Sequence, residues 1–180
     1  MLKVSFAAII ILLFSSCHDV KKREQLEEVG KMIAAVDSMQ KMLQEPPADS
    51  VRKVASSVSA VLLAIRESYR NDTLSLELAG KLDAYKMILT DLDTFREINR
   101  QIEAGILEER PGLVKLQEDI STGAGDRARY SEYIRFEKNK VAQLAVLLQS
   151  REEVRTRYMN IYHELHDEMK ELGRTGNFNA

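Results

Sequence analysis

The feature that most constrains the fold of this chain is the spacing of its apolar residues. Over residues 74–106, and again over 130–172, an apolar side chain recurs every three or four positions. This spacing gathers apolar side chains on one face of an α-helix. Eight glycines and three prolines in 180 residues leave few places for turns. The sequence therefore predicts an all-α protein built from long amphipathic helices.

Turn-forming residues divide the pattern into segments. A helix that begins near residue 25 should end at Pro46-Pro47, because a residue that precedes proline avoids helical geometry. Asp49 or Ser50 is expected to cap the second helix, which runs to about residue 70. Residues 71–73, Asn-Asp-Thr, are expected to cap a third helix that starts at about residue 74.

The third and fourth predicted helices are separated by Gly123-Ala124-Gly125, and Asp126 should cap the fourth, which reaches about Leu172. Pro111 interrupts the third helix. We favour a kink there over the alternative, in which residues 112–122 fold back as a separate short helix. Residues 173–180 lack periodicity and are predicted to be a flexible tail.

These lengths predict an elongated antiparallel helical bundle with coiled-coil hairpins. A short hairpin over residues 25–70 and a long hairpin over 74–172 form one helical domain, 25–172. We expect a four-helix bundle at one end, from which the long hairpin projects as a two-stranded coiled coil. Between Ile134 and Val141 the apolar step is missed, so that Glu137 or Lys138 falls in the seam as a polar layer.

The N-terminus is predicted to carry an export signal. Lys3 precedes an apolar run, Val4 to Phe14, broken only by Ser5. Eleven helical residues span about 16 Å, roughly half of a hydrocarbon core of ~30 Å. A charge followed by a short apolar run is the arrangement of a signal peptide.

Two small residues, Ser15 and Ser16, then lead into Cys17, the only cysteine of the chain. Here the sequence resembles the bacterial lipobox, although Phe14 stands where leucine is usual; relaxed versions that end in Ser-Ser-Cys resemble those of Bacteroidota lipoproteins. The resemblance implies removal of residues 1–16, lipidation of Cys17 and a lipidated tether over residues 17–24. It implies a lipid-anchored protein of the cell envelope, and we expect the outer membrane and, from the basic Lys21-Lys22, its periplasmic side.

Composition and motifs narrow the function. With 26 basic and 28 acidic residues, the chain lacks the basic excess that nucleic-acid binding favours. A single cysteine excludes an intramolecular disulfide and a zinc-thiolate cluster. There is no Gly-x-Ser-x-Gly elbow and no phosphate-binding loop. We therefore expect no enzyme activity and no cofactor.

The only cluster with the composition of a metal site is His163, His166 and Asp167, at helical spacings of three and four residues. The spacing fits neither the zinc-protease helix nor a di-iron bundle. A solvated helical face is the interpretation we prefer, and metal handling is kept as an alternative function.

Two further sets of residues are candidate surface sites. Tyr130, Tyr133 and Phe136 lie within two turns of the glycine turn and are candidate partner-binding residues; alternatively they pack on Leu116 and Ile120. Asp-Ser/Thr-aliphatic or Asp-Ser-Met tripeptides, which resemble the Bacteroidota O-glycosylation sequon, mark three possible modification sites: Ser38, Ser50 and Thr73.

The sequence thus favours a membrane-anchored, non-enzymatic helical lipoprotein that acts as a scaffold or protein-interaction module and holds an envelope protein. A periplasmic chaperone or ligand-binding bundle is the alternative from a second class.

Overall fold

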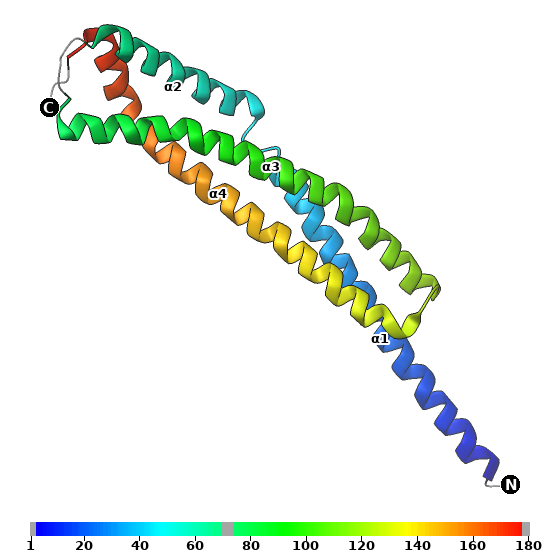
Figure 1. The fold of residues 1–180 in the computed structure, drawn as a ribbon. Coiled ribbons are helices and arrows are strands. Elements are labelled where there is room, and N and C mark those ends of the chain that lie inside the picture. Colours follow the sequence, from blue (N-terminus) through cyan, green and yellow to red (C-terminus); the bar gives the residue numbers. More distant parts are fainter. Residues whose placement is uncertain (1–2, 70–73, 178–180) are drawn as a thin grey trace. The chain divides into compact units, whose positions relative to one another are not determined.

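The fold is all-α, as predicted. The structure is a computed structural model that describes residues 3–69 and 74–177, with side chains from residue 20 onward. Within these residues, four α-helices and one short 3-10 helix follow one another (Figure 1). They are α1 (Lys3–Met42), α2 (Ala48–Ser68), α3 (Leu76–Thr122), η1 (Arg127–Arg129) and α4 (Tyr130–Thr175).

The helix boundaries follow the predicted turns with two differences. The cap predicted at Asp49 or Ser50 is wrong: α2 begins at Ala48, directly after Pro47, and no side chain caps it. Proline is tolerated at a helix start because it has no N–H to satisfy. The cap predicted at residues 71–73 lies outside the described residues. Within them, the Ser75 hydroxyl accepts a hydrogen bond from the backbone N–H of Leu78 at 3.2 Å.

α3 is continuous through Pro111, which confirms that the chain does not reverse there. Pro111 has no N–H, so the carbonyl of Leu107 lacks its usual helical donor. Both residues are exposed, and water can satisfy that carbonyl.

The helices form two compact units. In the first, α1 up to Gln40 packs with residues 104–145 of α3, η1 and α4; in the second, the described residues between 41 and 103, which include α2, pack with residues 146–177. The predicted short hairpin 25–70 is therefore not a packing unit, because α1 and α2 belong to different units. α3 and α4 contribute to both.

The first unit corrects the expectation of a projecting two-stranded arm. Side chains of α1 reach both helices of the long hairpin: Glu28 pairs with Lys138 of α4 at 2.7 Å, and Asp37 pairs with Arg110 of α3 at 2.7 Å. Between the three helices lies an apolar core that includes Val29, Val36, Ile106, Leu113, Ile120, Ile134 and Leu144. The distal half of the hairpin thus has a third helix on the face expected to be bare.

The second unit is a three-helix bundle with a continuous core. Its buried residues come from α2, α3 and α4 and recur at the spacing of an amphipathic helix: Val51, Val58, Val61, Ile65, Leu78, Leu82, Tyr85, Ile88, Leu92, Phe95, Val154, Tyr158, Leu165, Met169 and Leu172.

The chain ends of this architecture also differ from expectation. Residues 17–24, predicted to be a tether, lie within α1. α4 continues to Thr175, and a side chain placed at Gly173 would meet Ala64 of α2 at 3.1 Å. The predicted flexible tail therefore starts later than residue 173, and residues 178–180 lie outside the described part of the chain.

Candidate functional site

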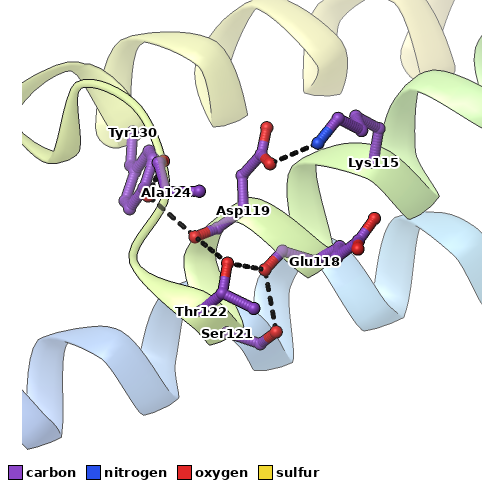
Figure 2. Close-up of polar contacts among 7 residues, drawn as sticks. All are labelled: Lys115, Glu118, Asp119, Ser121, Thr122, Ala124 and Tyr130. Atoms are coloured by element: carbon purple, nitrogen blue, oxygen red, sulfur yellow. Dashed lines mark hydrogen bonds and ion pairs between the residues drawn. The ribbon is translucent and has the colours of Figure 1, made fainter.

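The aromatic residues predicted to bind a partner lie in three different environments. Tyr130 is buried, and its hydroxyl donates to the backbone carbonyl of Asp119 at 2.8 Å and also contacts that of Ala124 (Figure 2). It closes the turn between α3 and η1 and has little surface left for a partner. Tyr133 is partly buried beneath the Arg129 guanidinium, whereas Phe136 is 60% exposed.

The turn itself is tightly built from local contacts. Gly123 and Gly125 adopt positive φ angles of 71° and 76°, which favour glycine. Asp126 caps η1, accepting from the N–H of Ala128 at 3.1 Å. Before the turn, the hydroxyls of Ser121 and Thr122 both donate to the Glu118 carbonyl, as Figure 2 shows. The glycine turn is as the sequence predicts, but Asp126 caps η1 and not the fourth long helix, which begins at Tyr130.

A strip of apolar residues lies on the outward face of α3 in the first unit. Leu107 is 75% exposed and Val114 is 42% exposed; Ala104 and Pro111, also exposed, complete a spacing of three, four and three residues. The strip lies opposite the buried face that contains Ile106 and Leu113. The strip was not predicted, because the apolar series expected to form the core was the only one considered on this helix. Its sequence signal is a second apolar series, which is out of phase with the series that forms the core.

The polar layer predicted near Glu137 is present between α3 and α4. Glu109 is buried, and its carboxylate pairs with the Lys140 ammonium at 2.6 Å, while Glu137 lies 3.7 Å from the same ammonium. Among the residues the structure describes, one oxygen of each carboxylate has no hydrogen-bond partner. Burial, and then the neighbouring Glu109 carboxyl, raise the pKa of Glu137 above its ordinary value.

The three metal candidates do not converge on one point. His163 and Asp167 are exposed, whereas His166 is partly buried with both ring nitrogens engaged: Nδ1 lies 2.6 Å from the Tyr85 hydroxyl and Nε2 lies 3.3 Å from that of Ser57. Burial lowers the pKa of His166. His166 thus joins α4 to α2 and α3. Among residues 20–69 and 74–177, no three His, Cys, Asp or Glu side chains are grouped so as to hold a metal ion.

A buried arginine anchors the loop before α2. Arg151 is 1% exposed; its Nε donates to the Asn99 side-chain oxygen at 2.6 Å, and its other nitrogens contact the Glu45 carbonyl and the Glu152 carboxylate. The guanidinium lies 4.7 Å from the centre of the Phe95 ring. Burial lowers the pKa of Arg151. No pattern in the sequence indicates this role, because Arg151 lies in a charged run.

The predicted modification sites are only partly described. Ser38 and Ser50 are exposed, whereas Thr73 lies outside the described residues. The side chain of Cys17, together with those of the predicted signal peptide 1–16, also lies outside them. Over the described part of the chain, no helix is both long and apolar enough to span a membrane.

No protein-family model, curated protein or solved structure matches this chain.

Proposed function

We propose that this chain is a lipid-anchored envelope protein, attached through Cys17, that acts as a non-enzymatic scaffold and holds a protein partner against α3. The observation that carries the proposal is the outward apolar strip of Ala104, Leu107, Pro111 and Val114. The lipobox-like sequence before Cys17 supports the anchoring. Tyr130 is buried and closes the turn, which favours the strip over the turn as the surface for a partner.

The strip has the properties of an interaction surface. Burying an exposed leucine or valine side chain contributes up to about 1.5–3 kcal/mol. Exposed apolar residues that follow one another along a helix face also permit helix-in-groove contacts, which use this spacing. The free carbonyl of Leu107, left by Pro111, adds one hydrogen-bond acceptor in the middle of the strip.

A matched pair of leucine substitutions tests the strip. A photo-crosslinking residue at position 107 should join the chain to a discrete partner in intact cells, and Leu107→Gln should reduce the recovery of that partner. Leu63→Gln is the control, because Leu63 is 55% exposed on α2 in the other unit. Both substitutions should leave stability within about 0.5 kcal/mol. Equal partner recovery from the two variants would remove the strip from the proposal.

A separate experiment tests the anchor. Cys17→Ser should yield an uncleaved or soluble chain without fatty acid, whereas the unsubstituted chain should incorporate labelled palmitate and sediment with membranes. The periplasmic side predicts resistance to protease added to whole cells. Acylated, membrane-bound Cys17→Ser protein would refute the anchoring site, and removal of the intact chain by external protease would refute the orientation.

A further inference from the structure

A basic cavity lies at the closed end of the first unit. Its volume is about 340 Å³, and it is bordered by the turn after α3 and by residues 21–25 of α1. Three cationic side chains line it: Lys21 and Lys22 from α1 and Arg127 from η1. Among the residues whose side chains the structure describes, no carboxylate lines it.

Two of the three cations, Lys22 and Arg127, are held in place by backbone carbonyls and not by acids. The Lys22 ammonium donates to the Ser121 carbonyl at 2.7 Å, and Arg127 Nε donates to the Gly123 carbonyl at 2.8 Å. Carbonyls fix the side chains but do not neutralise them. Within residues 20–69 and 74–177, none of the three forms a salt bridge.

Three nearby acidic residues are engaged elsewhere. Asp119 pairs with Lys115 at 2.6 Å, Asp126 caps η1, and Glu132 pairs with Arg129 at 3.1 Å. The three cations therefore share a cavity while their potential partners among these acids are occupied.

Gly123 positions the guanidinium. At its φ of 71° a residue with a side chain is strained, and a Cβ there would collide with the Arg127 guanidinium. The absence of a side chain lets Arg127 lie across the turn. The planar group is thereby held at the cavity with its terminal N–H donors not used by the Gly123 contact.

We propose that this cavity binds a phosphate group. A fixed guanidinium recognises phosphate through paired hydrogen bonds, and the two ammonium groups add positive charge beside it. In the part of the cavity lining that the structure describes, an entering anion would have no acid to displace. The volume exceeds the ~30 Å³ share of one water molecule about tenfold, which leaves room for a group attached to the phosphate.

The phosphate has two possible sources, the headgroup of an anionic phospholipid or a free phosphate compound. Lys21 follows Cys17 by four residues within α1, or about 6 Å along the helix. If Cys17 is anchored as proposed above, the cavity lies near the lipid headgroups. Only this choice of source depends on the proposed anchoring; the binding of phosphate does not.

The two sources can be separated with the full chain in a non-ionic detergent. Calorimetry at constant ionic strength measures binding of inorganic phosphate, and native mass spectrometry measures retention of phosphatidylglycerol against phosphatidylcholine. One phosphate or one phosphatidylglycerol per chain supports the site. Phosphatidylglycerol without inorganic phosphate assigns the headgroup, and inorganic phosphate alone assigns a free ligand; binding of neither overturns the proposal.

Matched variants tie the binding to the cavity. Arg127→Gln, and the double variant Lys21→Gln with Lys22→Gln, should each weaken binding roughly tenfold or more, as expected for the loss of charged hydrogen bonds. Lys31→Gln is the control, since Lys31 lies on the same helix but pairs with Glu27 at 2.7 Å. Equal losses in all variants would mean non-specific charge attraction and would overturn the site. Cys17→Ser should bind as the unsubstituted chain does, so a failure of anchoring is distinguishable from a failure of the cavity.

Discussion

Arg151 offers the sharpest test of how the second unit is held together. It is 1% exposed, and it ties the loop at Glu45 to α3 through Asn99 and stacks on Phe95. Arg151→Ala removes hydrogen bonds from a charged donor, which contribute ~1.5–3 kcal/mol each, and a cation–π contact of ~0.5–2 kcal/mol. Water can reach the exposed Glu45 and recover part of the loss. We expect a net destabilisation of about 3 kcal/mol.

The assay is urea unfolding followed by circular dichroism, with a thermal melt as a check. For a chain of this length, 3 kcal/mol corresponds to a decrease in Tm of roughly 6–12 °C. Arg155→Ala is the control, because Arg155 lies one turn further along α4, contacts the same Glu152 at 3.0 Å and is 42% exposed. An exposed pair contributes about 0–1 kcal/mol. The reasoning is refuted if Arg151→Ala costs no more than Arg155→Ala.

Three further predictions concern charge and burial. Glu137→Gln should stabilise the chain by about 1 kcal/mol near pH 8, which is the lower end of the cost of an unpaired buried polar atom. The gain should be smaller near pH 5, because a raised folded-state pKa means that stability is lost as the pH rises through that pKa. Equal gains at both pH values would contradict this. Because the folded-state pKa of His166 is lowered, the unfolded chain takes up the proton first, so the stability of the chain should fall as the pH falls below about 6.5. In urea unfolding, His166→Gln should lose less stability between pH 7.5 and 5.5 than the unsubstituted chain does. An unchanged loss of stability would exclude His166 as its source. Leu92→Asp should abolish cooperative unfolding, since Leu92 is 0% exposed and a buried unpaired carboxylate costs several kcal/mol, whereas Leu63→Asp should retain full helicity.

The sequence predicted the helices well because their information is local. Periodicity places Leu82, Tyr85 and Leu92 on one face whatever packs against them, and all three are buried. The glycine turn and the break at Glu137 are local signals in the same sense. The failed cap at Asp49 shows the limit of such reasoning, since Pro47 can begin a helix with no side-chain cap.

The choice of helix partners was not predictable in the same way. The apolar face of α1 fits either half of the long hairpin, because both halves present the same spacing. What distinguishes them is cross-helix charge, such as Glu28 with Lys138, and contacts such as Lys22 with Ser121, separated by about a hundred residues. The phosphate cavity was missed for the same reason, since Lys21, Lys22 and Arg127 share no motif. The spacing of the outward strip is present in the sequence, but only the structure shows which of the two apolar series on α3 is buried.

The cross-helix ties of α1 have a mechanical consequence. In chain order, Lys22 contacts Ser121, Gln25 contacts Ser131, Glu28 contacts Lys138 and Asp37 contacts Arg110. If the anchor pulls at residue 17 and a partner holds the α3 strip, the tension runs along the axis of α1. These four contacts then bear the force together, in shear, whereas peeling would break them one after another. The first unit should therefore withstand larger forces when pulled from residue 17 against position 107 than when α1 is peeled away from its C-terminal end at residue 42.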